Sequence, residues 1–353
     1  MGCYHPLKGF PNGYTNQGRT NFIVTSARVD HIEIDNQGSI RKCFSRGISA
    51  NTKLCISGSE AVEIPCGQCI GCRLDYSNQW ASRCLLEMQN YKENCFITLT
   101  YDDEHVPESY YCTVKDHKEH ISLTLCKRDL QLFWKSLRKA FPGKKIRYYA
   151  CGEYGDHTAR PHYHAIVFGL MPDDLIPASS YNDKFVDTSE LGYNYYVSPK
   201  LNSIWKRGCV LVTNASWETA AYTARYVMKK LKGMKADFYD HNCIIPEFVT
   251  MSRRPGIGAD WFEDNKKCYS IFLKQYIKTE KGSRELCTIR YFDNKLDESY
   301  PFDLQKIKKT RKEFEKYRKK LKQQETSIPY LDLLEIEEKL KIDRTKIFKR
   351  INF

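Results

Sequence analysis

Residues 147–169 read RYYACGEYGDHTARPHYHAIVFG, and this stretch decides the fold class. Two runs of strand-forming residues, Arg147–Glu153 and His162–Gly169, lie on either side of a short segment that contains Gly, Asp and Pro. Strand-like runs separated by turn-forming residues are typical of a β-hairpin. The sequence therefore predicts two paired antiparallel strands at the centre of the chain.

Three side chains that can hold a metal ion converge on this hairpin. Side chains two residues apart point to the same side of a strand, so the imidazoles of His162 and His164 face one way. Glu153 on the paired strand can reach the same face and complete a site of two histidines and one carboxylate, with open positions for water and substrate. A His-x-His pair alone also fits ordinary surface or core histidines, but the carboxylate on the neighbouring strand favours the metal site.

Further elements follow on both sides of the hairpin. Apolar residues at three- and four-residue steps predict helices from Gln79 to Tyr91, over Lys127–Phe141 and from residues 213–216 to Leu231. Runs of strand-forming residues predict strands over Phe96–Tyr101 and Cys209–Val212. Helices packed against one antiparallel sheet form the simplest architecture for this order, so we expect an α+β fold.

The helix that ends near Leu231 places two tyrosines on one face. Tyr222, Tyr226 and Lys230 are four residues apart, whereas Trp217 and small or aliphatic residues gather on the other face. Tyrosine can act as a covalent nucleophile, but its phenol has a pKa near 10 and needs activation. A divalent ion that polarises a phosphate, and a lysine that stabilises negative charge, would supply it. The alternative is that both tyrosines belong to the core.

A cluster of cysteines lies in the Gly- and Asn-rich first 78 residues. Cys66, Cys69 and Cys72 form two consecutive Cys-x-x-Cys steps, which bring three thiolates within reach of one tetrahedral zinc. Cys3 is the preferred fourth ligand, and the zinc would be structural, because its binding energy would fold a loop-rich segment. Three ordinary thiols or an iron–sulfur cluster are the alternatives, and other possible fourth ligands are His5, Cys55 and Cys84.

Composition restricts the class of protein. The chain has 353 residues, enough for two or three domains, and a net charge of +13. Residues 304–322 hold ten basic side chains against two acidic ones, and aromatic residues make up 13% of the chain. Because basic groups neutralise phosphates and aromatic rings stack on bases, single-stranded nucleic acid is the favoured partner. The alternative is a basic protein with a solvated helix near its end.

Membrane insertion and secretion are not expected. The longest apolar run, Ala165–Met171, is much shorter than the roughly 20 residues that a membrane span needs, and the first residues lack the apolar core of a secretory signal. We therefore expect a cytoplasmic protein. In a reducing compartment, an odd total of 15 cysteines indicates a metal site rather than a disulfide framework.

These motifs, taken in order, resemble those of the HUH endonucleases, the family of rolling-circle replication initiators and their relatives. The resemblance rests on the strand 96–101, on residues 152–155 leading to 160–164, and on the helix with paired tyrosines. The cysteine cluster and Ser252–Gly258 resemble the replication initiators of gokushoviruses (Microviridae) more closely. Together the similar segments cover about residues 1–262.

The resemblance implies an RRM-like central antiparallel sheet and a nickase that depends on Mg²⁺ or Mn²⁺. By motif match, His162, His164 and Glu153 would hold the ion, and Tyr222 and Tyr226 would be the nucleophiles. Attack on phosphorus would leave a 5′-phosphotyrosine and a free 3′-hydroxyl at the replication origin, and the reverse step would join strands. Alternatives are a non-catalytic single-strand binding module and a relaxase or transposase of the same superfamily.

The remaining expectations concern DNA contacts, domains and partners. The segment 1–91 would carry the zinc site, 92–262 would form the nickase domain, and 263–353 would end in basic helices. Because the sequence has no phosphate-binding loop, a host helicase and a host polymerase would act with this protein in the bacterial cytoplasm. The residues expected to contact DNA are Arg160, Arg225, Arg253 and Arg254.

Overall fold

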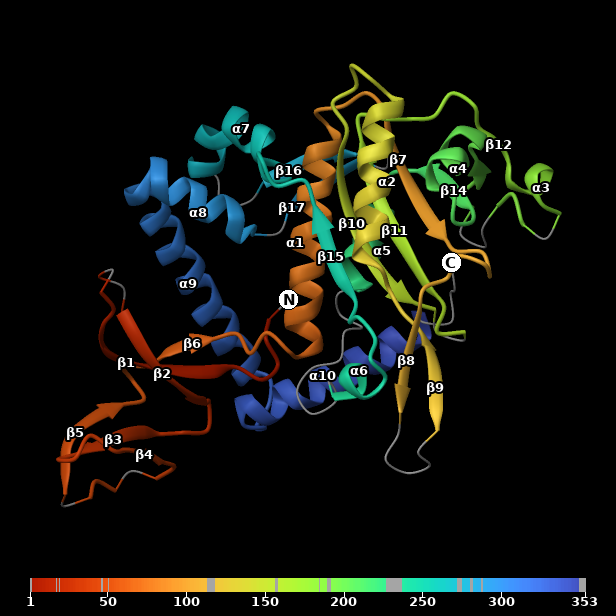
Figure 1. Cartoon of the computed structure of the whole chain (residues 1–353). Helices are drawn as coiled ribbons and strands as arrows, with labels where there is room; N and C mark the ends of the chain where they lie inside the picture. Colours follow the sequence, from red (N-terminus) through yellow and green to blue (C-terminus); the bar gives the residue numbers. More distant parts are fainter. Residues whose placement is uncertain are drawn as a thin grey trace. The chain divides into compact units, whose positions relative to one another are not determined.

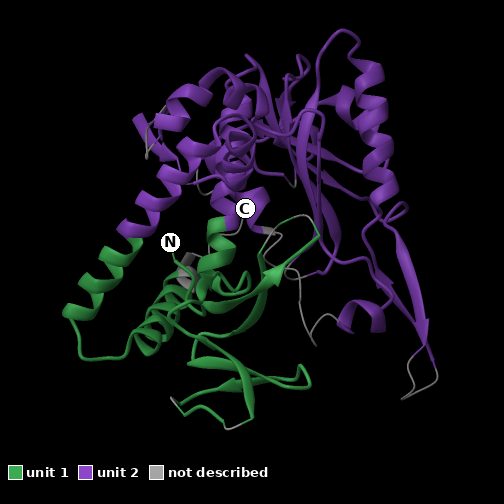
Figure 2. Ribbon diagram, turned by 90° about the vertical axis from the view of Figure 1, so that its left-hand side faces the viewer, with its two compact units in different colours: residues 1–75, 315–352 green, residues 76–314, 353 purple. Residues whose placement is uncertain are grey.

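The computed structural model describes residues 2–348 except 17, 19, 46, 50, 113–117, 156–157, 184, 189–191, 227–236, 272–274, 280–281 and 287. The chain divides into two compact units, residues 1–75 with 315–352, and residues 76–314 (Figure 2). Helices and antiparallel sheets occur together, so the predicted α+β class is confirmed. The domain boundaries proposed at residues 91 and 262 stay predictions.

A seven-stranded sheet is the centre of the second unit (Figure 1). Every strand pairs with its neighbours in the antiparallel direction, and the predicted hairpin is present, with Glu153 directly opposite His162. The strand order is β12 (Ile176–Pro177), β13 (Tyr196–Val197), β14 (Val210–Asn214), β7 (Asn94–Thr100), β11 (Pro161–Phe168), β10 (Arg147–Tyr154) and β15 (Phe248–Met251).

One face of this sheet packs against α2 (Lys127–Ala140) and α4 (Pro199–Trp205). The apolar positions of α2 recur at helical spacing, and Leu130, Phe133 and Leu137 are buried against alternate residues of β7 and β11. The predicted helix over Lys127–Phe141 is thus confirmed. This face is filled with apolar side chains, so the polar residues of the same strands must point the other way.

The other face packs against α1 (Ile70–Met88) and α5 (Trp217–Tyr226). Ser216 and Thr219 cap the start of α5, because the hydroxyl of each accepts a hydrogen bond from the backbone N–H of the other. The described part of α5 ends at Tyr226, so the predicted helix end at Leu231 lies outside the described residues. The small residues Ala220 and Ala224 let α5 lie close to the sheet.

A third apolar cluster joins the later helices of this unit. It contains Phe262, Phe292, Leu304 and Ile307, whereas Phe314, two helical turns after Ile307, is exposed. The elements not yet given are β8 (Glu108–Cys112), β9 (Glu119–Leu123), α3 (Ala178–Tyr181), α6 (Asp237–His241), α7 (Ala259–Ile271), β16 (Gln275–Thr279), β17 (Gly282–Leu286), α8 (Arg290–Ser299) and α9 (Pro301–Gln324).

The first unit contains two three-stranded sheets and α10 (Tyr330–Phe348). The sheets are β2 (Thr20–Ser26), β1 (Leu7–Tyr14) and β6 (Val62–Ile64), and β4 (Ile40–Cys43), β3 (His31–Asp35) and β5 (Thr52–Ser57). A small core of Phe10, Val29, Ile32 and Ile56 joins them, although the sequence pattern predicted no core there.

The predicted helix start at Gln79 is wrong, because α1 begins at Ile70. Its first turn is fixed by packing rather than by apolar periodicity: a Cβ at Gly71 would lie 2.3 Å from the carbonyl oxygen of Gly2. Among the described residues, every helix is too short or too polar to span a lipid bilayer.

Candidate active site and cysteine cluster

Glu153, His162 and His164 come together on the face of the sheet that carries α1 and α5. One oxygen of Glu153, Oε1, accepts hydrogen bonds from Nε2 of His162 at 2.7 Å and from Nε2 of His164 at 3.0 Å. Glu153 and His164 are buried, and His162 is partly exposed. The structure thus brings together the three residues that the sequence predicts as metal ligands.

The second nitrogen of each imidazole also has a partner. Nδ1 of His162 donates to the carbonyl oxygen of Arg160 at 3.1 Å, and Nδ1 of His164 lies 2.9 Å from the hydroxyl of Thr98. Histidines that bind metals usually hold their other ring nitrogen in this way, which here keeps both Nε2 atoms aimed at the position that an ion would take beside Glu153. The donor set of two imidazoles and one carboxylate therefore fits a divalent cation.

The charge of this cluster is set by two opposing effects. Burial opposes ionisation of Glu153, but the hydrogen bonds from His162 and His164 outweigh it and lower the pKa of the carboxyl to about 2. Glu153 is therefore an anion throughout the neutral range, and a cation at this position would be attracted rather than repelled.

Tyr222 lies next to the histidines. Its ring meets the imidazole of His164 edge to face, with the ring centres 5.2 Å apart, and Phe96 stacks on the same imidazole at 5.5 Å. Tyr222 is partly exposed and opens into a cavity of about 310 Å³. The cavity is lined by Phe96, Thr98, Thr100, Gly155, Thr158, Arg160, Pro161, His162, His164, Tyr193, Tyr195, Leu211, Thr213, Thr219 and Tyr222.

The other predicted residues of this helix are only partly described. Tyr226 is the last residue of the described part of α5, one helical turn after Tyr222, and Lys230 lies outside the described residues. Arg225 is exposed, and its Nε donates to the carbonyl oxygen of Ala221 within the same helix at 3.3 Å. The predicted roles of these residues stay predictions.

The predicted DNA-contacting arginines separate into two places. Arg160 lines the cavity and pairs with the exposed carboxylate of Asp103 at 2.7 Å. Arg253 and Arg254 are exposed and follow β15, at the end of β10 where Ser252 donates to the carbonyl of Tyr148. At about 3.4 Å per residue, Glu153 lies about 17 Å farther along β10, so the structure does not bring these two arginines to the cavity.

Sequence reasoning missed the residues that line the cavity from other strands. Thr98 reaches His164 because β7 pairs with β11, and Tyr193 and Tyr195 come from the segment before β13. Pairing between strands far apart in the sequence leaves no local signal. The polar residues Thr98 and Thr100, which alternate with buried apolar residues in the strand, are the one pattern that could have indicated them.

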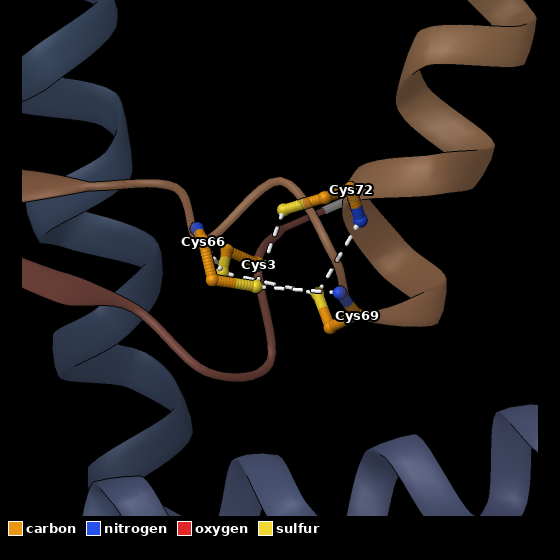
Figure 3. Close-up of side chains that lie close together, drawn as sticks. All are labelled: Cys3, Cys66, Cys69 and Cys72. Atoms are coloured by element: carbon orange, nitrogen blue, oxygen red, sulfur yellow. Dashed lines mark hydrogen bonds between the residues drawn. The ribbon is translucent and has the colours of Figure 1, made fainter. Parts of the chain in front are cut away.

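The four predicted zinc ligands converge in the first unit. Figure 3 shows Cys3, Cys66, Cys69 and Cys72 pointing toward one another from the N-terminal segment, the loop after β6 and the first turn of α1. The sulfur atoms of Cys3 and Cys69 are 3.8 Å apart, and those of Cys66 and Cys72 are 4.0 Å apart. Zn–S bonds of about 2.3 Å in a tetrahedron require sulfur atoms about 3.8 Å apart, so the cluster fits zinc.

Backbone N–H groups surround these sulfur atoms. Cys66 donates to the sulfur of Cys3 at 3.2 Å, and Tyr4 and Cys72 donate to that of Cys69 at 3.3 and 3.4 Å. Burial raises the pKa of the Cys69 thiol, but the bonds from Cys72 and Tyr4 outweigh it and lower that pKa to about 7. A thiolate is the form that binds a metal.

The structure also bears on the alternative fourth ligands. His5 donates to Glu338, and Cys84 is buried in the core of the second unit. Cys55 lies opposite Glu33 in the sheet of β3, β4 and β5. Cys3 is therefore the residue that completes the cluster, as predicted.

Comparisons with known proteins match most of the chain. A sequence family described as replication-associated protein ORF2/G2P matches residues 94–231, from β7 through α5. Replication-associated protein ORF2 of Spiroplasma virus 4 is 36% identical over 78% of this chain and 81% of its own length. Replication-associated protein VP4 of Bdellovibrio phage phiMH2K is 30% identical over 67% of this chain and 68% of its own length. Replication-associated protein ORF4 of Chlamydia phage 1 is 30% identical over 62% of this chain and 49% of its own length. No solved structure matches the chain significantly.

Proposed function

Because the chain belongs to the replication-associated proteins of phages of the Microviridae, and is thus a phage replication initiator, we propose that it nicks one DNA strand at the replication origin and later rejoins strand ends. The observation that carries the proposal is the position of Tyr222. Its phenol belongs to a cavity that also contains His162 and His164, so nucleophile and cation ligands can face one phosphate.

Strand cleavage in this proposal needs a tyrosine as its nucleophile and no water molecule. The phenol of Tyr222 loses its proton and its oxygen attacks phosphorus, so a new P–O bond forms as the bond to the 3′ oxygen breaks. The 3′ oxygen takes a proton and becomes a free hydroxyl that can prime synthesis, while the 5′ phosphate stays on tyrosine. In the reverse direction a 3′-hydroxyl attacks the phosphotyrosine, which rejoins DNA without another source of energy.

Glu153, His162 and His164 would hold Mg²⁺ or Mn²⁺ in this proposal. When bound, the ion polarises a phosphate oxygen and stabilises the charge that develops in the transition state. The protein's own groups keep both Nε2 atoms turned toward Glu153, since Thr98 and the carbonyl of Arg160 hold the opposite ring nitrogens. The cysteine cluster would hold a structural zinc.

Tyr226 gives the cycle a second nucleophile. On a helix, side chains four residues apart lie about 5–6 Å from each other at Cβ. One tyrosine can therefore keep the old strand end while the other attacks the regenerated junction. Lys230, one further turn along the sequence, would stabilise the negative charge on the phenol or the phosphate.

The fold and partners complete the proposal. Two helices on each face of an antiparallel sheet, with the histidines on a central strand, support an HUH-like domain within residues 92–262. The residues proposed to contact single-stranded DNA are Arg160, Arg225, Arg253 and Arg254, and the basic part of α9 adds to the attraction. A host helicase and a host polymerase in the bacterial cytoplasm would separate and copy the strands.

A covalent adduct tests the proposal. Full-length protein is incubated with a labelled single strand that contains the origin, in Mn²⁺, and denatured; peptide mass spectrometry then identifies the modified side chain. We expect Tyr222→Phe or Tyr226→Phe alone to keep some single-turnover cleavage and to fail in the full cycle, and the double variant to form no adduct. Tyr276→Phe removes an exposed phenol far from α5 in sequence and controls for the substitution.

Two outcomes would contradict the proposal. Adducts at wild-type level in the double variant would refute the assignment of the nucleophiles. Strong binding of the single strand with no adduct in the wild-type protein, at saturating Mn²⁺, would favour a non-catalytic binding module.

A further inference from the structure

A second group of metal-binding side chains lies in the first unit, in the sheet of β4, β3 and β5. His31 and Glu33 are two residues apart on β3, and Cys43 on β4 is directly opposite His31. Residues paired across antiparallel strands share a face, so all three side chains point to one side. One ligand atom from each lies within 4.8 Å of the others.

The orientation of His31 is the most informative feature. The side chain is 6% exposed, its Nδ1 lies 3.3 Å from the carboxylate of Asp30, and its Nε2 points toward Oε1 of Glu33 at 3.5 Å. That Nε2 atom is buried and makes no hydrogen bond to any residue that the structure describes. If Nδ1 donates to Asp30, the lone pair of Nε2 faces a carboxylate, which is unfavourable unless a positive charge lies between them.

Glu33 is held in place as an anion. Its side chain is 4% exposed, and Oε1 accepts a hydrogen bond from the backbone N–H of Ser49 at 2.7 Å. Among the described residues, the guanidinium of Arg41 pairs with this carboxylate, with its Nη1 3.9 Å from Oε2. Because the Arg41 side chain is 71% exposed, it compensates the buried carboxylate only weakly.

From this geometry we propose that His31, Glu33 and Cys43 form a second metal site, which takes zinc or a chemically similar divalent ion. Nitrogen, oxygen and sulfur donors together match the ligand preferences of zinc. Ligand atoms around a tetrahedral zinc lie about 3.3–3.8 Å apart, so small side-chain rotations close the site. Cys43 releases its proton to solvent as it binds. Cys55, opposite Glu33 on β5, faces the same side of the sheet.

The proposed ion links β3 to β4. The buried core of this unit is Phe10, Val29, Ile32 and Ile56, with Ile23 and Ala61 packed against it, which is little apolar material for six strands. A metal bound on the opposite face of β3 from Ile32 would stabilise the sheet where apolar packing does not reach. This site does not depend on the proposed nicking activity.

The competing explanation is a buried ion pair, with a protonated His31 between Asp30 and Glu33 and no metal. Metal content separates the two explanations. Full-length protein is purified from zinc-supplemented cells, and zinc per chain is measured by elemental analysis and native mass spectrometry. The variants are His31→Gln and Cys43→Ser, with Cys72→Ser to remove the first cluster and Cys112→Ser as a matched control at an exposed thiol.

We expect His31→Gln and Cys43→Ser each to lose about one equivalent of zinc relative to the wild type, in the presence or absence of Cys72→Ser. Cys112→Ser should keep the wild-type content. Unchanged zinc content in both His31→Gln and Cys43→Ser would overturn the proposal in favour of the ion pair.

A measurement on the wild-type protein covers the case in which these variants do not fold. Cysteines are alkylated before and after removal of metal by a chelator, and the modified peptides are quantified. Cys43 should react only after chelation, whereas Cys112 should react equally in both. Equal reaction of Cys43 with and without chelator would also overturn the proposal.

Discussion

Replacing Thr98 with valine tests how the site orients a metal ligand. Thr98 lies on β7 directly opposite His164, and its hydroxyl is 2.9 Å from Nδ1 of that histidine. Valine has nearly the same shape but no hydroxyl, so the ring loses its partner while the packing around it is kept. We expect weaker binding of the catalytic cation, with little change in cleavage once the cation is saturating.

The size of the effect follows from the environment of His164. Removing one partner of a buried hydrogen bond costs about 1–3 kcal/mol, and His164 is 6% exposed. Outer partners of metal-binding histidines typically contribute about 10–100-fold in metal affinity, or about 1.4–2.7 kcal/mol. The concentration of Mn²⁺ at half-maximal cleavage should therefore rise by about 10–100-fold.

The assay is cleavage of a labelled origin strand at increasing Mn²⁺, with thermal unfolding as a check on folding. Thr100→Val is the matched control, because Thr100 lies two residues on along β7 and its hydroxyl donates to the carbonyl of Cys209 rather than to an imidazole. It should keep a half-saturating Mn²⁺ concentration close to the wild-type value. Equal values for the wild type and both variants would refute the orienting role of Thr98.

Two further predictions concern the cysteine cluster and Glu153. Cys72→Ser should remove about one zinc per chain and lower the melting temperature by more than about 5 °C, whereas Cys268→Ser at an exposed thiol should do neither; an unchanged metal content would contradict the zinc assignment. The pKa of Glu153 is lowered from 4.5 to about 2, so its ionised form stabilises the fold above pH 4.5 and that contribution is lost as the pH falls toward 2. In chelator, the difference in unfolding free energy between the wild type and Glu153→Gln should shrink below pH 4.5, and a constant difference from pH 6 to pH 3 would contradict this.

Local sequence patterns were sufficient to predict the central hairpin and helix α2. The two strand-forming runs in residues 147–169 and the turn between them were enough to predict that Glu153 reaches the same face as the histidines, because a hairpin pairs neighbours in the sequence; the structure places Glu153 directly opposite His162. The same holds for α2, whose apolar spacing is regular and whose end is marked by Pro142 and Gly143. Where the interaction is local, the residues themselves predict it.

Contacts between distant segments could not be predicted in this way. The start of α1 at Ile70 depends on Gly71 fitting against Gly2, and the carboxylate of Glu338 accepts from the backbone N–H of Ile70. The hydrogen bond between Thr98 and His164 depends on which strands become neighbours in the sheet. Neither leaves a periodic signal, because each partner is chosen by tertiary packing.

The segment from Cys3 to Cys66 begins and ends at the cysteine cluster. Its first strand pairs with its last, Leu7 opposite Ile64, and the sulfur of Cys3 accepts from the backbone of Cys66. The residues between Leu7 and Ile64 thus form one large loop whose two ends are paired. A longer or shorter turn within this loop would leave the four sulfur atoms where they are. Changes of loop length that spare β3 and β4, which carry the proposed second metal site, are therefore expected to leave the cysteine cluster intact.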